Sequence, residues 1–157
     1  MWLDGEKFKG VVGTTPLISI DLIVRNTISQ VLLGRRNNRP AQGDWFVPGG
    51  RITKNETVAD AYARLLYKEL GVEGGSIDDA KFLGVYQHFY ADSVFGDSPS
   101  THYIVLGFEV RLGKVDICSV PLDQHDDYKW FDEETLLEMT EVHHYTKDYF
   151  RKSLSYR

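Results

Sequence analysis

The pattern of hydrophobic and polar positions predicts several strands around one central helix. LISIDLIVR (17–25) is rich in β-branched and aliphatic residues and predicts a strand, followed by a turn at 26–29 and a second strand at 30–36. Asparagine, proline and glycine predict a loop over 37–43. DWFVPGGRI (44–52) predicts a short strand that runs into a Gly-Gly turn, where the backbone can approach a ligand closely.

The segment from about Glu56 to Leu70 predicts a helix. Asn55 can cap its start and Gly71 can end it. The apolar positions that repeat at helical spacing are Val58, Tyr62, Leu66 and Leu70.

The second half of the chain predicts further strands and a broken helical end. Polar loops are expected at 91–100 and 114–124. A final helical region is interrupted around 139–142 and ends in KDYFRKSL (147–154). The remaining strands are expected at 80–90, 101–112 and 127–131. Strands interleaved with a central and a C-terminal helix predict a mixed sheet between helices.

Composition restricts the class of protein. With 157 residues, 42% hydrophobic and 26% charged, residues 1–157 are expected to form a single soluble domain. A net charge of −5 argues against generic attraction to nucleic acid. The lone Cys118 excludes an intramolecular disulfide framework and fits a reducing compartment. MWLDGEKFKG has no apolar signal-peptide core, and no run approaches the length of a membrane span. We therefore expect a cytoplasmic protein.

GGRITKNETVADAYARLLYKELGV (49–72) carries the frame of a known motif. It resembles the Nudix box: Gly, five residues, Glu, seven residues, then Arg-Glu-aliphatic-any-Glu-Glu-any-Gly-aliphatic. Leu65 and Lys68 stand where the box has glutamates. The positions that match are Gly50, Glu56, Arg64, Leu66, Glu69, Gly71 and Val72. The resemblance implies an α+β fold, the Nudix α/β/α sandwich with a central mixed sheet.

The spacing of the box predicts two polar faces on its helix. The charges at i, i+4 and i+8, which can pair along one ridge, are Glu56, Asp60 and Arg64. Positions 65, 68 and 69 share another face, where a typical Nudix helix carries three carboxylates that hold more than one Mg²⁺. Of the three side chains at these positions, only that of Glu69 can ligate a metal. We therefore expect one Mg²⁺ per subunit, with Mn²⁺ able to substitute.

The altered box resembles the GDP-mannose mannosyl hydrolase branch of the Nudix family. TPLISIDLIV, LLGRRNNRPAQGDWFVPGGR, QHFY, THYIVLGF and DQHDDYKW are similar to that branch, from about Phe8 to Phe131. Its members cleave the bond between the anomeric carbon and the diphosphate oxygen. Attack at phosphorus meets anionic oxygens that several cations must offset, whereas attack at carbon passes through an oxocarbenium-like transition state. The resemblance therefore explains why two carboxylates are dispensable.

The resemblance also implies a metal site and a general base. The metal ligands are the Gly49 carbonyl, Glu69 and Gln124, with diphosphate oxygens and water. His125 is the expected base, because a histidine near its ordinary pKa suits proton abstraction at neutral pH. His88 is an alternative base, or a residue that bonds the substrate.

Substrate contacts follow from the same resemblance. Arg36 and Arg51 are expected to bind the diphosphate, since the guanidinium fork matches phosphate oxygens. Tyr103 is expected to contact the diphosphate or to pack in the core. Asp21 lies in an otherwise apolar strand, where an unpaired charge is costly, so a sugar contact or support for an arginine is expected. Phe8 is expected to stack on guanine or to pack on the core.

Two other functions stay open at this point. An orthodox Nudix pyrophosphohydrolase would release GMP and a sugar 1-phosphate, against which Leu65 and Lys68 count. A catalytically silent nucleotide-sugar sensor would have no need of a base. The choice between GDP-mannose and GDP-glucose as substrate rests on contacts to single sugar hydroxyls, which the sequence does not reveal. A homodimer is implied by the resemblance.

Overall fold

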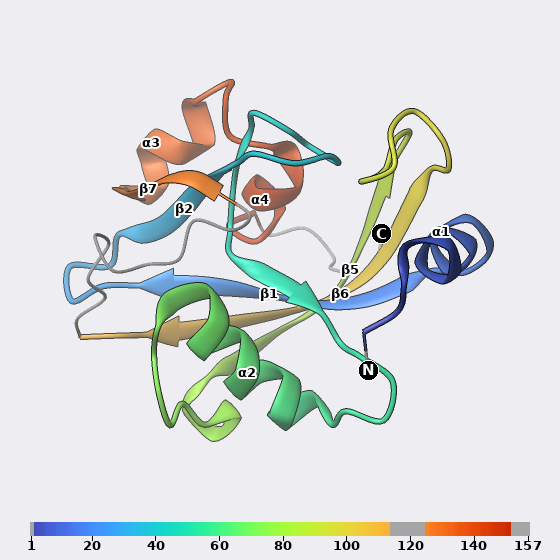
Figure 1. The fold of residues 1–157 in the computed structure, drawn as a ribbon. Coiled ribbons are helices and arrows are strands. Elements are labelled where there is room, and N and C mark those ends of the chain that lie inside the picture. The colour runs from blue at the N-terminus through green and yellow to red at the C-terminus, as the bar shows by residue number, and fades with distance from the viewer. Residues whose placement is uncertain (1, 114–124, 152–157) are drawn as a thin grey trace.

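A mixed β-sheet forms the centre of the molecule in the computed structural model, which describes residues 2–113 and 125–151 (Figure 1). Its main path runs β3–β2–β1–β6–β5, with β4 added to β1 and β7 added to β2. β1 and β6 pair in parallel and the other pairs are antiparallel. The strands are β1 (Leu17–Arg25), β2 (Val31–Arg36), β3 (Trp45–Phe46), β4 (Gly49–Arg51), β5 (Lys81–Tyr90), β6 (Thr101–Arg111) and β7 (His125–Phe131).

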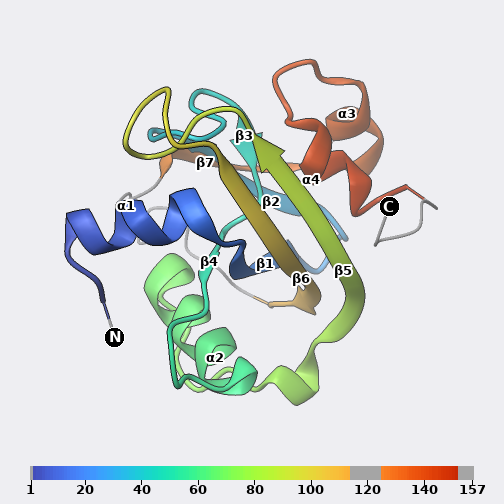
Figure 2. The same cartoon turned by 90° about the vertical axis from the view of Figure 1, so that its right-hand side faces the viewer.

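Helices cover both faces of this sheet. The helices are α1 (Gly5–Thr14), α2 (Val58–Leu70), α3 (Glu133–Glu138) and α4 (His144–Asp148), with a 3₁₀ turn η1 (Ile77–Asp79). α2 lies on one face, α3 and α4 lie on the other, and α1 crosses one end of the sheet (Figures 1 and 2). Tyr62 and Leu66 of α2 belong to the apolar cluster on one face of the sheet, and Leu136 and Tyr149 belong to the cluster on the opposite face. The expected α/β/α sandwich with a mixed sheet is confirmed.

α2 begins and ends through local polar contacts. The Thr57 hydroxyl accepts a hydrogen bond from the Asp60 amide at 3.1 Å and donates one to the Asp60 carboxylate at 2.7 Å. Gly71 ends the helix in the left-handed region at φ 69°, as expected. Asn55 does not cap it, because that residue lies in the preceding turn at φ 67°. Val58 is exposed at the first turn, so the buried stripe starts one turn later than expected.

The predicted Gly-Gly turn is wrong, since Gly49 and Gly50 lie in strand β4. They pair with Asp21 and Ile20 of β1. A Cβ on Gly49 would lie 2.3 Å from the Ile20 carbonyl oxygen, and one on Gly50 would lie 2.6 Å from Cδ2 of Leu65. The glycines are therefore needed for close packing rather than for a turn.

Other expectations have mixed outcomes. The strand expected from 127 begins two residues earlier, at His125, and the broken helical end is present as α3 and α4. The loop expected at 114–124 lies outside the described residues. Helix α1 was not expected; it is capped by Asp4, whose carboxylate accepts from the Lys7 amide at 2.9 Å. In the described part of the chain, no helix is long and apolar enough to cross a membrane.

Candidate active site

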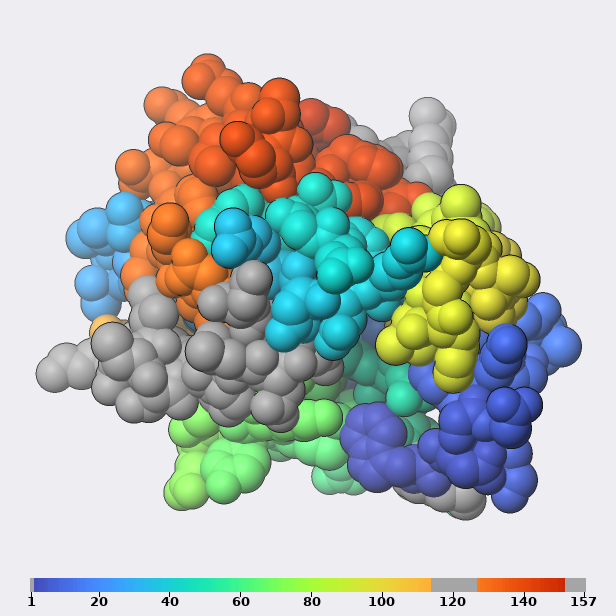
Figure 3. Space-filling view, turned by 45° about the horizontal axis from the view of Figure 1, so that its top comes forward, coloured from blue at the N-terminus to red at the C-terminus, as the bar shows by residue number. Residues whose placement is uncertain are grey.

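A cleft of about 180 Å³ brings together most of the expected site residues. Figure 3 shows this hollow framed by the cyan segment around 37–50, the yellow 91–100 loop and the dark-blue N-terminal segment. The expected residues that line it are Asp21, Arg36, Gly49, Arg51, Glu69, His88 and Tyr103. Phe8 lines an adjoining pocket, which shares Arg36, Arg51 and Tyr103 with the cleft.

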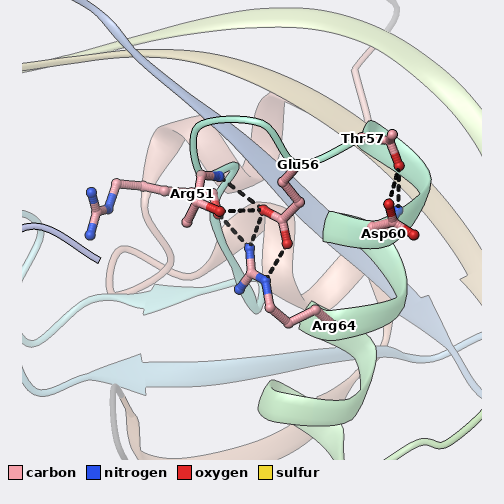
Figure 4. Close-up of polar contacts among 6 residues, drawn as sticks. Arg51, Glu56, Thr57, Asp60 and Arg64 are labelled. Carbon is pink, nitrogen blue, oxygen red and sulfur yellow. Dashed lines mark hydrogen bonds and ion pairs between the residues drawn. The ribbon is translucent and has the colours of Figure 1, made fainter. Parts of the chain in front are cut away.

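The loop that precedes α2 is braced by an ion pair. The Arg64 guanidinium donates to the Glu56 carboxylate at 2.6 Å from Nε and 2.9 Å from Nη2, and to the Arg51 carbonyl at 2.8 Å (Figure 4). Hydrogen bonding from Arg64 lowers the pKa of Glu56 to about 2. The expected ridge is thus correct for Glu56 and Arg64 but wrong for Asp60, which bonds Thr57 instead. The Arg51 side chain points away from the brace (Figure 4).

One carboxylate faces the cleft from α2. Leu65, Lys68 and Glu69 all line it, so these positions share a face as expected. Leu65 is 2% exposed and packs against Gly50. Lys68 lies with its ammonium 4.9 Å from the Trp2 ring centroid. Glu69, which is 4% exposed, is the one acidic residue among these three positions.

These cleft residues offer oxygen donors of the kind that suits Mg²⁺. Glu69 and Gly49 border the same cleft, and Mg²⁺ prefers oxygen ligands from one or two carboxylates together with substrate phosphates and water. In residues 2–113 and 125–151, no group of three or more His, Cys, Asp and Glu side chains is placed to hold a metal. The third expected ligand, Gln124, lies outside the described residues.

Two arginines and a tyrosine form the cationic wall of the cleft. Arg36 donates from Nε to the Pro40 carbonyl at 2.9 Å, which fixes its direction at the end of β2. The Arg51 guanidinium carbon lies 3.9 Å from the centre of the Phe8 ring, and burial lowers its pKa. Burial raises the pKa of Tyr103, against the charges of Arg51 and Arg36 nearby. Phe8 thus packs on an arginine rather than on the core.

Asp21 is held by a partner that the sequence did not suggest. Its Oδ2 accepts a hydrogen bond from the Tyr149 hydroxyl at 2.5 Å, and both side chains are buried. Burial raises the pKa of Asp21 to about 7, although Tyr149 and the Arg36 charge lower it. Tyr149 lies beyond the segment that carries the family resemblance. A buried acid in an apolar strand signalled that some partner exists, without identifying it.

His88 lines the cleft and carries a buried ring nitrogen. It is 3% exposed, and its Nε2 has no hydrogen-bond partner among the described residues. Its ring stacks on Tyr145 with centroids 4.2 Å apart and planes 11° apart. Burial, with His143 and His144 nearby, lowers the pKa of His88 to about 3. A ring held neutral at pH 7 suits hydrogen bonding to a ligand better than proton abstraction.

His125 is the first residue of β7. Its backbone pairs with Arg36 of β2, across an irregularity between Arg35 and Arg36. Its side chain lies outside what the structure describes. The pairing puts the His125 backbone beside a strand end that carries a cleft residue.

A model of the NUDIX domain matches residues 15–152, which contain the box and most of the cleft. The chain belongs to the NUDIX family. Membership supports a hydrolase that acts on a small nucleotide substrate. Divalent metal ions such as Mg²⁺ are general in Nudix hydrolases, which agrees with the oxygen donors of the cleft.

Several known proteins are similar to this chain in sequence or in fold. The low-salt glycan biosynthesis protein Agl8 of Haloferax volcanii is 41% identical over 128 residues, which cover 81% of this chain and 78% of that protein. A MutT protein from Methanosarcina mazei Go1 is 26% identical, with a TM-score of 0.67 over 87% of this chain and 92% of that one. The NUDIX domain of Shewanella oneidensis NrtR, complexed with ADP ribose, is 20% identical with a TM-score of 0.63 over 96% and 92%.

Proposed function

We propose that this Nudix hydrolase converts GDP-mannose to GDP and free mannose by attack of water at the anomeric carbon. The observation that carries the proposal is the cleft face of α2, where Leu65 and Lys68 accompany a single acid, Glu69. A buried leucine cannot ligate a metal, and a lysine opposes a second cation. A site with one carboxylate on α2 fits attack at carbon better than attack at phosphorus.

The cationic wall supports departure of GDP. Arg36, Arg51 and Tyr103 border both the cleft and the adjoining pocket. A diphosphate on these three residues would leave one pocket for the sugar and the other for the nucleoside. Because arginine keeps its charge and can bond two phosphate oxygens, the pair offsets the negative charge that develops on the leaving diphosphate. Phe8, in the adjoining pocket, stands on the nucleoside side in this arrangement.

The remaining site residues are assigned to metal binding, proton abstraction and sugar binding. Glu69, the Gly49 carbonyl and Gln124 would hold one Mg²⁺, which neutralises diphosphate charge when bound. His125 takes the proton from the attacking water, as the family resemblance implies. His88 is assigned to the sugar, because this residue lines the cleft, its buried Nε2 has no hydrogen-bond partner among the described residues, and its ring is neutral at pH 7. Asp21 supports Arg36 or contacts a sugar hydroxyl.

Similarity to a glycan biosynthesis protein favours a sugar nucleotide over other nucleotides. The 41% identity to Agl8 spans 81% of this chain. GDP-glucose is the second hexose that the same cleft would accept, since discrimination between epimers rests on single hydroxyl contacts. The family resemblance also implies a homodimer, which sedimentation of the purified protein would test.

The deciding experiment is hydrolysis of GDP-mannose with Mg²⁺ in heavy-oxygen water. We expect the label in free mannose beside unlabelled GDP. Label in GMP or in mannose 1-phosphate would show attack at phosphorus, the reaction of an orthodox Nudix pyrophosphohydrolase. Binding of GDP-sugars without turnover would show a sensor. Glu69→Gln serves as the matched control, because it keeps the shape of the side chain and removes its charge.

A further inference from the structure

The hydroxyl of Tyr149 is the partner that fixes the buried Asp21 carboxylate. The bond of 2.5 Å lies at the short end of the range for O–H···O hydrogen bonds. Asp21 lines the cleft, whereas Tyr149 does not. Any effect of this hydroxyl on a bound substrate therefore passes through Asp21.

The second oxygen of Asp21 is also confined. A Cβ on Gly49 would lie 2.8 Å from Oδ1 of Asp21, so this oxygen packs against the backbone of β4. β4 and β1 are paired at these two residues. With one oxygen bonded to Tyr149 and the other against β4, the carboxylate keeps one orientation toward the cleft.

The Tyr149 ring is itself held in place. It packs edge-on against Tyr86, with centroids 4.5 Å apart and planes 68° apart. A Cβ on Gly107 of β6 would lie 3.1 Å from Cε1 of Tyr149 and 3.1 Å from Cε2 of Tyr86. The absence of a side chain at Gly107 thus makes room for both rings, and the hydroxyl position follows from this packing.

The same C-terminal segment supports a second cleft residue. Tyr145 of α4 donates its hydroxyl to the Phe89 carbonyl at 3.0 Å and accepts from the Phe89 amide at 2.8 Å. Its ring stacks on His88. Figure 2 shows α4 beside the C-terminal end of β5, which carries His88. α4 and the turn after it therefore support Asp21 and His88 together.

We propose that Tyr149 is a positioning residue for the hydrolysis, acting by holding the Asp21 carboxylate in its working orientation. This inference rests on the proposed function. Removing the hydroxyl should leave the cleft lining intact and let the carboxylate turn. Misplacement of a functional group by a fraction of an ångström to an ångström costs roughly tenfold to a hundredfold in rate. We expect Tyr149→Phe to lower kcat about tenfold and to leave KM within about twofold.

The experiment compares Tyr149→Phe, Asp21→Asn and the double variant in GDP-mannose hydrolysis with Mg²⁺. Tyr86→Phe is the matched control, because it removes a hydroxyl from the ring packed on Tyr149 without touching the bond to Asp21. If Tyr149 acts through Asp21, the double variant is no slower than Asp21→Asn alone. A residue with a purely structural role would add its loss to that of Asp21.

A second variant keeps the test informative if Tyr149→Phe folds poorly. Gly107→Ala retains the hydroxyl but crowds the two rings, and it should lower kcat in the same way with KM preserved. Unchanged kcat in a folded Tyr149→Phe protein, or additive losses in the double variant, would overturn the positioning role and leave the proposed function standing. A wild type that turns over no GDP-hexose would overturn the proposed function and this inference with it.

Discussion

Replacement of Glu56 by glutamine is a direct test of the brace beneath the box loop. In the wild type, Arg64 bonds the carboxylate at 2.6 and 2.9 Å and the Arg51 carbonyl at 2.8 Å. Glu56→Gln keeps the size of the side chain and the possibility of accepting from the Thr53 amide, but removes the charge. The variant should therefore lose the ion pair without opening a cavity.

The size of the loss follows from the pKa of Glu56. A fall from 4.5 to about 2 corresponds to at most about 3 kcal/mol of stability at neutral pH. The side chains of Arg64 and Glu56 are 28% and 13% exposed, so water screens part of this interaction. We expect about 1–2 kcal/mol after this discount.

The stabilisation that Glu56 contributes should decrease as the pH falls. A carboxyl whose pKa is lowered by folding stabilises the protein above its unfolded pKa, and the contribution is lost as pH falls from 4.5 toward about 2. Urea unfolding at pH 7 should show the full difference between wild type and Glu56→Gln, and the difference should shrink below pH 4.5. Asp60→Asn, in the first turn of the same helix, should leave the Glu56 contribution intact. Equal stability of wild type and Glu56→Gln at pH 7, or a difference that grows in acid, would refute the reasoning.

Three further changes test the cleft. Glu69→Gln should lower Mg²⁺-dependent turnover at least about a hundredfold without unfolding the protein, measured by initial rates beside thermal unfolding. Arg51→Lys should lower kcat/KM about tenfold or more in the same rate assay, because lysine offers no guanidinium fork and stacks less well on Phe8. His88→Asn should lower kcat/KM, yet the pH–rate profile between about pH 5 and 8 should keep its inflections, since the pKa of His88, about 3, lies below that window. A shifted inflection in His88→Asn would instead identify His88 as the base.

Local pattern was sufficient for most of the fold. The β-branched run 17–25 and the helical spacing before Gly71 predicted β1 and α2, because residue preference and helical period are encoded within a few neighbouring residues. The sequence-based predictions were wrong where contacts between residues distant in the sequence determine the local structure. Gly49 and Gly50 read as a turn, but they are glycines because β1 and Leu65 approach them closely. Thr57 and Asn55 are both plausible caps by residue type, and only the path of the preceding loop selects Thr57.

In the candidate site, too, the features set by local spacing could be predicted, and those set by long-range contacts could not. The box frame was enough to predict that positions 65, 68 and 69 share a face, because helical spacing is local. The contact between Tyr149 and Asp21 joins residues 128 positions apart and has no local signature. The role of Phe8 beside Arg51 likewise depends on how α1 crosses the end of the sheet.

The leucine in the box is part of the core, so if the proposed attack at carbon holds, one substitution there should not readily restore attack at phosphorus. Leu65 is 2% exposed, belongs to the apolar cluster around Tyr62 and Leu66, and fills the space above Gly50. Leu65→Glu would put a carboxylate into that cluster, where an unpaired charge costs several kcal/mol unless it is neutralised. Lys68→Glu carries no such penalty, because the Lys68 side chain lies over Trp2 at the cleft edge. We therefore expect Lys68→Glu alone to fold and still to release GDP rather than GMP, since a second acid without one at position 65 does not rebuild the full carboxylate face. Release of GMP by that single variant would show that Lys68, and not the buried Leu65, keeps attack away from phosphorus.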